Sequence, residues 1–321
     1  MRTFLAITVL MALFTAGLAT AQGRTVGVVL KTLANPFWGA MREGIEEGGK
    51  SVGLTLIIQA VPSEQDVEPQ LNTCLNLLQR NVNALVVAAI NATNLLPCIR
   101  EANRRNIPVV DLDANLDPAI LQREGLRVAF SISSDNRRAG GQAAEYLVQK
   151  KGNNFRGKVL IIEGLAGNPT SAARRDGFRE RLAQLAPQAS IVASLPGDWD
   201  RLKAANITND VLQRHPDLSA IYAANDTMAL GAVEAVFAAG KGSQVVVIGT
   251  DGNADAVRSI RAGRLTASVA QLPYLVGFQA IENLAKVLQG QTVPSRIIVP
   301  TLVIDREILE QGRDPLLRYL R

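Results

Sequence analysis

The chain has 321 residues, of which 47% are hydrophobic, enough for more than one large buried core. The formal net charge of +5 is spread along the chain without a basic block or a basic stripe interleaved with aromatic residues, so nucleic acid is not an expected partner. A chain of this length is typical of two domains.

The first 21 residues have the pattern of a secretory signal peptide. Arg2 supplies a short basic start, Phe4 to Ala16 is an apolar segment too short to span a membrane, and Ala19-Thr20-Ala21 has the small-x-small form of a cleavage site. No cysteine stands at that point, which argues against a lipid anchor there. We therefore predict an exported chain that is cleaved near Ala21 and begins near Gln22.

From Thr25 onward, short apolar runs alternate with helix-like patterns almost without interruption. Continuous apolar runs are typical of buried strands, and Asn35-Pro36 is a typical helix start, with an N-cap residue followed by proline. In the first half, strands are predicted at 25–30, 54–58, 84–89, 108–112 and 127–132, and helices at 35–53, 67–80 and 94–105.

The second half continues this alternation and ends in a basic tail, 313–321, that is expected to be solvated. Strands are predicted at 158–162, 191–195, 220–223, 245–248, 266–270, 297–299 and 302–304, and helices at 138–150, 171–185, 201–213, 227–239, 254–261 and 275–288. The alternation predicts parallel sheets covered by helices on both faces. The strands are too many for one doubly wound sheet of usual size, so two similar α/β lobes, dividing near 131–135, fit better than the rival (β/α)8 barrel.

Polar and aromatic side chains follow many of these predicted strands. Open α/β sheets bind ligands at the carboxyl ends of their strands. Each Asn or Asp alone is well explained as a helix cap, but that explanation does not account for the whole set. Three of the fourteen aromatic residues also lie there. The candidate ligand-binding residues are Lys31, Asn35, Phe37, Trp38, Asp113, Asn168, Arg174, Trp199, Asn225, Asp251 and Gln271.

The chemistry of this set indicates a neutral ligand that is rich in hydroxyl groups. Planar Asn, Asp, Arg and Gln side chains offer paired donors and acceptors that match neighbouring hydroxyls, and aromatic rings can cover the C–H face of a sugar. Lys31 and Arg174 balance Asp113 and Asp251, and a site whose charges cancel suits an uncharged ligand. We expect no catalytic residue, no metal and no cofactor.

Two cysteines, Cys74 and Cys98, lie on the predicted helices that flank one strand. In an oxidising compartment they either form a disulfide between neighbouring helices or are two buried, small apolar side chains, and both alternatives stay open. A zinc site is not expected, because the single histidine, His215, is distant from both cysteines.

A series of motifs resembles those of the periplasmic sugar-binding proteins of the ribose/galactose/allose type, the type I solute-binding components of ABC importers. The resemblance covers nearly all of residues 24–304 and points to the allose type through Lys31, Trp38, Asn168 and Trp199. Its motifs are KTLANPFW at 31–38, LD at 112–113, EGLAGN at 163–168, ARR at 173–175, DWDR at 198–201, ANDTMA at 224–229, GTDG at 249–252 and VAQLP at 269–273.

This resemblance implies two Rossmann-like, doubly wound lobes joined by a hinge of three crossings, with the sugar held between them. The N-terminal lobe would comprise residues 22–131 and 272–299, and the C-terminal lobe 132–271 and 300–321. The candidate residues from Lys31 to Asp113 would form the first lobe's wall, those from Asn168 to Asp251 the second lobe's wall, and Gln271 would lie near the hinge.

The resemblance also implies a function and partners. The protein would be a periplasmic monomer that captures a neutral monosaccharide, either an aldohexose like D-allose or a sugar like ribose. It would deliver that sugar to an ABC transporter permease in the inner membrane. A chemoreceptor is a second candidate partner.

One position departs from the family pattern. After Leu112-Asp113 the ribose type has arginine and the allose type an acidic residue, whereas this chain has Ala114. A buried hydroxyl without a partner costs about 1–3 kcal/mol. The expected ligand therefore lacks that hydroxyl, places it elsewhere, or is an acyclic sugar alcohol such as a hexitol or pentitol.

Two other classes of protein compete with a binding protein. A sugar-acting enzyme would use Asp113 and Asp251 as acid and base, or Lys31 to form a Schiff base, but the chain has no G-x-S-x-G, H-E-x-x-H or phosphate-loop motif. A sugar-responsive transcription regulator would need an N-terminal helix-turn-helix, where this chain has the predicted signal peptide. We therefore expect a binding protein and not an enzyme.

Overall fold

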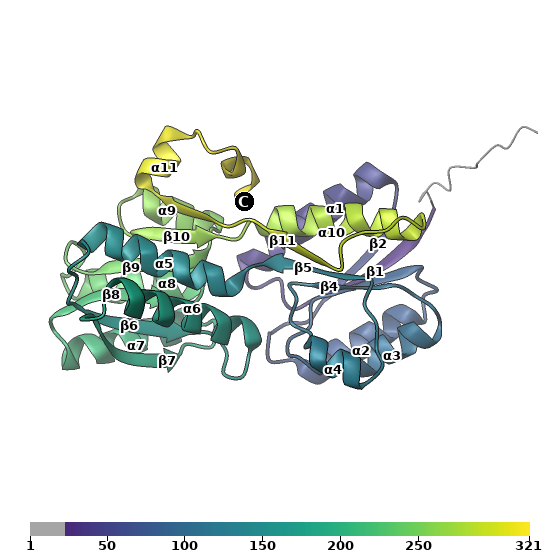
Figure 1. Ribbon diagram of the computed structural model, residues 1–321, viewed down its shortest axis with the longest axis horizontal. Helices are drawn as coiled ribbons and strands as arrows, with labels where there is room; N and C mark the ends of the chain where they lie inside the picture. Colours follow the sequence, from purple (N-terminus) through teal and green to yellow (C-terminus); the bar gives the residue numbers. More distant parts are fainter. Residues whose placement is uncertain (1–22) are drawn as a thin grey trace, which may run out of the picture.

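The computed structural model describes residues 23–321, which form two α/β lobes lying side by side (Figure 1). Each lobe is built on one six-stranded sheet with helices on both faces. Two separate open sheets rule out the (β/α)8 barrel and confirm the predicted doubly wound lobes. The two sheets also share one topology, because their strand orders, β11-β5-β4-β3-β1-β2 and β12-β10-β9-β8-β6-β7, correspond position by position.

The first sheet is parallel throughout. Its strands are β1 (Thr25–Leu30), β2 (Thr55–Ala60), β3 (Ala84–Val87), β4 (Val109–Leu112), β5 (Phe130–Ser134) and β11 (Arg296–Val299). Its helices are α1 (Pro36–Val52), α2 (Val67–Leu78), α3 (Leu96–Arg104), α4 (Pro118–Arg123) and α10 (Pro273–Leu288). Helix α4 forms in a segment for which no helix was predicted, because Asp117 caps it and Pro118 occupies its first position.

The second sheet is parallel except for its antiparallel edge strand β12. Its strands are β6 (Lys158–Glu163), β7 (Ser190–Pro196), β8 (Leu218–Ala223), β9 (Val246–Asp251), β10 (Ala267–Ala270) and β12 (Leu302–Asp305). Its helices are α5 (Asn136–Lys151), α6 (Pro169–Leu185), α7 (Arg201–Arg214), α8 (Asp226–Ala238), α9 (Ala254–Arg261) and α11 (Arg306–Gln311), followed by the short 3₁₀ helix η1 (Pro315–Tyr319).

The chain passes between the two sheets three times, from β5 to α5, from β10 to α10 and from β11 to β12. Strand β5 runs to Ser134, so the first sheet extends three residues beyond 131, the predicted end of that lobe's first segment. The strand is longer than predicted because Ser133 and Ser134, although polar, are buried beside the crossing. There the Ser134 hydroxyl donates to the Gln271 carbonyl at 3.1 Å.

Two helix pairs, one in each lobe, approach each other through glycine. Where α1 lies against α10, a Cβ at Gly44 would be 1.9 Å from the Tyr274 carbonyl oxygen. Where α5 lies against α6, a Cβ at Gly140 would be 2.0 Å from the Arg174 carbonyl oxygen. Only glycine permits this approach. Helices α1 and α6 carry candidate site residues, whereas α10 and α5 directly follow two of the crossings, so these contacts join the site to the hinge.

The C-terminal tail is only partly solvated: its arginines are exposed, as expected, whereas its apolar side chains are half-buried and packed. Leu317 and Leu320 pack against the largest core cluster. The Tyr319 ring stacks on that of Tyr274 in α10 with 6.2 Å between centres, and the Arg321 guanidinium lies 4.3 Å from the centre of the Tyr274 ring. The tail therefore follows a strand of the second sheet and contacts a helix of the first lobe. In Figure 1 the C-terminus accordingly lies between the lobes.

The N-terminal prediction concerns residues that the structure does not describe. The signal peptide predicted at 1–21 lies outside the described range of 23–321. The first strand begins at Thr25, shortly after the predicted cleavage point. Within residues 23–321, no helix combines the length and the apolar character needed to cross a membrane.

Cys74 of α2 and Cys98 of α3 form a disulfide, which decides between the two alternatives left open by the sequence. Both side chains are fully buried and belong to the core on one face of the first sheet, together with Leu77 and Ile99. The disulfide therefore links the neighbouring helices α2 and α3 within an apolar core.

We expect the double substitution Cys74→Ala, Cys98→Ala to lower the free energy of unfolding by about 3 kcal/mol, because the bond restricts the unfolded chain over a sequence separation of 24 residues. Ligand affinity should be unchanged, since neither cysteine lies among the candidate ligand contacts. Urea unfolding of the oxidised protein, the reduced protein and the variant measures the effect. A variant as stable as the oxidised protein would contradict it.

Candidate ligand-binding site

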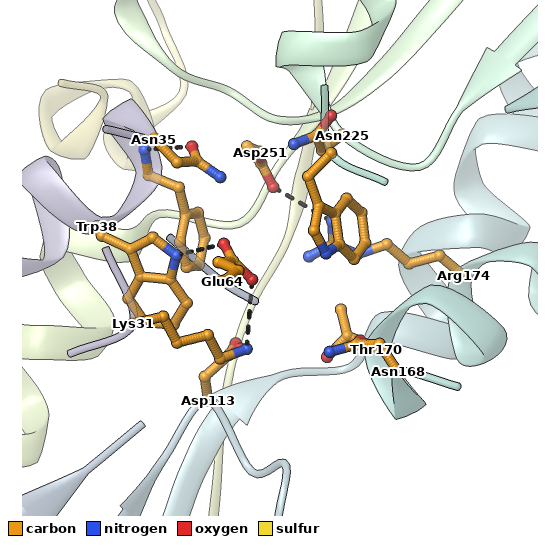
Figure 2. Close-up of a pocket in the computed structure, with 12 residues that line it drawn as sticks. Lys31, Asn35, Trp38, Glu64, Asp113, Asn168, Thr170, Arg174, Asn225 and Asp251 are labelled. Carbon is orange, nitrogen blue, oxygen red and sulfur yellow. Dashed lines mark hydrogen bonds and ion pairs between the residues drawn. The ribbon is translucent and has the colours of Figure 1, made fainter. Parts of the chain in front are cut away.

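Ten of the eleven candidate residues line one cavity between the lobes, and Figure 2 shows them facing one another from both sides. The eleventh, Gln271, lies behind this lining and donates from Nε2 to Asp251 Oδ1 at 2.6 Å. The cavity opens into a wider cleft at Asn35, Glu64 and Trp199. A small molecule held between the two lobes would be reached from this cleft.

The first lobe's wall is organised around Lys31, which follows β1. Its Nζ lies 3.6 Å from Asp113 Oδ2, 4.0 Å from Glu64 Oε2 and 5.0 Å from the centre of the Trp38 ring. Trp38 Nε1 donates to Glu64 Oε1 at 2.9 Å, and Phe37 packs edge-to-face on Trp38. Because the only donor of Trp38 is already bound, this residue offers a ligand its ring surface alone.

The second lobe's wall is organised around Arg174 of α6, which is almost fully buried. Its Nη1 donates to the Ala224 carbonyl at 2.6 Å and lies 3.4 Å from Asp251 Oδ1, while its Nε donates to Asn136 Oδ1 at 2.9 Å. The guanidinium also lies 5.9 Å from the centre of the Trp199 ring. One side chain thus orders the ends of β8 and β9 and the start of α5.

Three candidate asparagines, Asn35, Asn168 and Asn225, are helix N-caps and cavity residues at once. In each, Oδ1 accepts the backbone N–H of a residue in the first helical turn, at 2.9–3.1 Å. Because the oxygen end of each amide is fixed in this way, the nitrogen end is the one left to act as a donor elsewhere. A capping role for Asp251 is wrong, since Asn253 is the N-cap of α9.

Two donors of the second wall are buried without a protein partner within the described chain, namely Trp199 Nε1 and Asn225 Nδ2. Buried N–H groups are rarely left unpaired in native proteins. Both side chains line the cavity, so a ligand oxygen placed there would accept from them. The carboxylates of Asp113 and Asp251 supply acceptors on opposite walls of the same space.

The backbone around the cavity adopts the left-handed conformation at several residues other than glycine. Such conformations cost roughly 1–3 kcal/mol each and gather at functional sites. The consecutive pair at 198–199 turns the Trp199 indole toward the cavity. The left-handed residues of this region are Asp113 (φ 66°), Ala114 (φ 46°), Asp198 (φ 53°), Trp199 (φ 63°), Asp251 (φ 133°) and Leu272 (φ 57°).

Two cavity residues, Glu64 and Thr170, were not among the candidates. Strand β2 runs to Ala60, two residues beyond its predicted end, and Glu64 lies in the loop that follows it. That polar loop after a strand was the signal that could have found it. Thr170 opens α6 directly after the candidate Asn168, and no pattern distinguishes it from an ordinary first-turn residue.

Glu64 changes the charge of the site. The predicted balance of two cations and two carboxylates is wrong, because three carboxylates face Lys31 and Arg174. Burial raises the pKa of Asp251 well above its usual range, and the nearby Arg174 opposes that rise. The net charge of the cavity therefore lies between 0, with Asp251 protonated, and −1, with Asp251 ionised. An anionic ligand is disfavoured, and a neutral one remains the best match.

Asp226, beside the candidate Asn225, is a buried carboxylate that organises this wall from behind. Its Oδ2 accepts the backbone N–H groups of Gly252 at 2.7 Å and Asn253 at 3.0 Å, and its Oδ1 accepts the Ser268 hydroxyl at 2.6 Å. These bonds hold the loop that directly follows Asp251. Burial raises the pKa of Asp226 to about 6, although all three hydrogen bonds oppose the rise.

We expect Asp226→Asn to stabilise the protein at neutral pH and to have less effect in acid. A carboxyl with a pKa of about 6 in the folded state and 3.8 as its reference value binds its proton more tightly when folded, so its ionisation destabilises the fold as pH rises through that window. The gap in the free energy of unfolding between variant and wild type should widen by about 2 kcal/mol from about pH 4.5 to about pH 7.5.

Urea unfolding of both proteins at the two pH values tests this expectation. The asparagine can keep the geometry, with Oδ1 accepting the two backbone N–H groups and Nδ2 donating to Ser268. Asp255→Asn, at an exposed carboxylate in the first turn of α9, is the matched control and should show no such widening. A gap that is independent of pH would contradict the assigned direction.

The fold and this cavity define a class of protein that the comparisons with known proteins identify. Residues 26–292 match the family described as the periplasmic binding protein domain, and the chain belongs to that family. The D-allose-binding periplasmic protein of Escherichia coli is 39% identical over 283 residues, covering 86% of this chain and 90% of that protein. The ribose import binding protein of E. coli is 32% identical, covering 88% and 91% respectively.

Solved structures agree with these relatives. An ABC transporter periplasmic solute-binding protein from Actinobacillus succinogenes, with bound D-allose, superposes with a TM-score of 0.85 at 32% identity and covers 90% of this chain and 99% of its own. A solute-binding protein from Agrobacterium vitis with bound D-fucose gives a TM-score of 0.83 at 28% identity, covering 92% and 99%. The predicted family and the periplasmic-binding-protein architecture are thereby confirmed.

Proposed function

We propose that the chain captures a neutral monosaccharide between its lobes and delivers it to the permease of an ABC importer. The observation that carries this proposal is the set of unsatisfied groups around one small cavity. Within residues 23–321, Asn225 Nδ2 and Trp199 Nε1 are buried donors without a protein partner, and the Asp113 and Asp251 carboxylates line the same space. A polyhydroxylated ring satisfies both kinds of group, because each hydroxyl donates and accepts.

The proposed ligand is an aldohexose like D-allose or an aldopentose like ribose. The D-allose- and ribose-binding relatives support this choice. The rings of Phe37, Trp38 and Trp199 add the apolar surface that a sugar's C–H face needs. Ala114 does not line the cavity, so the site lacks a polar side chain from that position, and a sugar alcohol is the alternative ligand to be tested beside the sugars.

Isothermal titration calorimetry of the exported form tests the proposal with D-allose, D-ribose, a hexitol and a hexose phosphate. We expect one-to-one binding of at least one neutral compound and none of the phosphate, because the cavity has a net charge of 0 to −1 and no uncompensated cation. Absence of binding across the neutral compounds would overturn the proposal. Tight binding of the phosphate would overturn the neutral ligand class.

The proposal extends to export and to partners. Residues 1–21 would direct the chain to the periplasm, where it would act as a monomer, with the permease as its first partner and a chemoreceptor as its second. Mass spectrometry of the secreted protein measures the cleavage point, which we expect near Ala21. Light scattering with and without sugar measures the mass in solution, and a stable dimer would contradict the monomer.

A further inference from the structure

Two hydrogen bonds from side chains of the second lobe to groups of the first lobe join the lobes across the cleft. Thr170 Oγ1, at the start of α6 in the second lobe, donates to Asn115 Oδ1 in the first lobe at 2.9 Å. Asn168 Nδ2 donates to the Ile90 carbonyl oxygen of the first lobe at 3.2 Å. Asn115, Asn168 and Thr170 are all less than 9% exposed, so these bonds are shielded from water.

The bond from Thr170 to Asn115 is the more informative of the two, because both ends of the Asn115 amide are hydrogen-bonded. While Oδ1 accepts from Thr170 of the opposite lobe, Nδ2 donates to Asp113 Oδ2 of its own lobe at 3.1 Å. A hydroxyl is the donor at one end and a carboxylate is the acceptor at the other, so only one orientation of the amide satisfies both partners. Asp113 lines the cavity, whereas Asn115 does not.

The local backbone makes this arrangement available. Asp113 and Ala114 are both left-handed, with φ of 66° and 46°, and they turn the chain sharply after β4. After this turn the Asn115 amide reaches back to the Asp113 carboxylate, to which its Nδ2 donates at 3.1 Å. Alanine at 114 leaves the neighbouring Asn115 as the polar side chain that reaches the second lobe at this loop.

We propose that Asn115 is a positioning residue that couples closure of the lobes to the orientation of the Asp113 carboxylate, which would bind a sugar hydroxyl. In the closed protein Thr170 fixes the Asn115 amide, and the fixed amide holds Asp113 Oδ2. When the lobes separate, the Thr170 hydroxyl leaves, the amide is free to rotate, and Asp113 loses a donor of fixed direction. This inference rests on the proposed function, because it assigns Asp113 to the reading of a sugar hydroxyl.

The coupling predicts different effects for the two partners of the bond. Thr170 also lines the cavity, but its hydroxyl is bonded to Asn115, so the similarly sized Thr170→Val removes the closing bond and should weaken binding of every sugar by the same factor, about two- to tenfold. Thr170→Ser keeps the hydroxyl that makes this bond, so it should lose less affinity than Thr170→Val. Asn115→Ala also frees Asp113, so it should weaken binding further and change the ratio of affinities between two sugars that differ at one hydroxyl.

The experiment combines calorimetry on two such sugars with small-angle X-ray scattering of the sugar-free proteins. We expect the double variant Asn115→Ala, Thr170→Val to bind no more weakly than Asn115→Ala alone, since one shared bond is lost in both. Sugar-free Thr170→Val should be more open than the wild type, and Thr170→Ser should not. Thr208→Val is the matched control for a purely local effect. Thr208 is also a buried threonine, but its hydroxyl donates to the Ala204 carbonyl within α7. This variant should match the wild type in affinity and in scattering.

Two results would overturn the coupling. One is additive losses of affinity in the double variant. The other is a Thr170→Val protein identical to the wild type in affinity and in scattering. Failure of the wild type to bind any sugar would instead overturn the proposed function, and the scattering comparison of the sugar-free proteins would still decide whether Thr170 holds the lobes closed.

Discussion

Replacing Arg174 with alanine is expected to weaken sugar binding at least about a hundredfold. Removal of one member of a buried ion pair costs about 3–5 kcal/mol of folding stability, because the remaining charge is left without compensation. The cavity wall around Asp251 would have to rearrange before it could bind, and each 1.4 kcal/mol of that cost is a factor of about ten in affinity. Here the loss of the Arg174 guanidinium leaves Asp251, a buried carboxyl beside Asp226, without its cation. It also leaves the Ala224 carbonyl without its donor.

Arg174→Lys should not restore affinity, because a lysine ammonium cannot reproduce the fork that reaches Asn136, Ala224 and Asp251 together. Arg175→Ala is the matched control. Arg175 is the next residue on α6, but it pairs with Glu163 and Asp176 and does not line the cavity. Calorimetry on variants checked for folding by circular dichroism measures the effect, and binding by Arg174→Ala within a few-fold of the wild type would contradict it.

Gly164→Ala is expected to weaken sugar binding more than tenfold while the second lobe stays folded. A Cβ at Gly164, just after β6, would lie 2.0–2.3 Å from three ring atoms of the Trp199 indole. Overpacking of this kind costs about 1–3 kcal/mol. Because the indole lies between Gly164 and the cavity, the displaced ring would enter the space that the sugar needs.

Gly39→Ala is the matched control for this glycine. Gly39 lies in α1 beside Trp38, and a Cβ there would meet nothing within 4 Å. In a helix interior, alanine in place of glycine stabilises by roughly 0.5–1 kcal/mol, so this variant should be slightly more stable and bind as the wild type does. Calorimetry and urea unfolding of both variants make the comparison. Equal affinities for Gly164→Ala and the wild type would show that Trp199 does not shape the site.

The sequence supported most of the fold and much of the cavity lining for a common reason. The local periodicity of hydrophobic residues indicates the alternation of strands and helices. Parallel sheets place the carboxyl ends of their strands at one edge. Asn225 and Asp251 could therefore be placed at one edge from their positions after two apolar runs. Asn225 proved to be a cap and a cavity residue together, because its amide has two different ends.

The residues that were missed depend on relations that local patterns do not carry. Glu64 reaches the site because β2 ends later than its apolar run suggests. The bond between the Thr170 hydroxyl and Asn115 Oδ1 joins two different lobes, so no pattern within either segment indicates it. The packing of the C-terminal tail was not predicted, because Leu317, Tyr319 and Leu320 form too short an apolar pattern to indicate burial.

The three crossings have a consequence for the order in which the lobes are completed. The second sheet has every strand but its edge strand β12 once Ala270 has been made. The first sheet, begun earlier at Thr25, still lacks its edge strand β11 and the helix α10 that packs through Gly44. In a chain made from its N-terminus, each sheet therefore has five of its six strands by Ala270, and the lobe that began first still waits for α10 to cover α1. The first lobe keeps an uncovered face on α1 until the last fifty or so residues arrive.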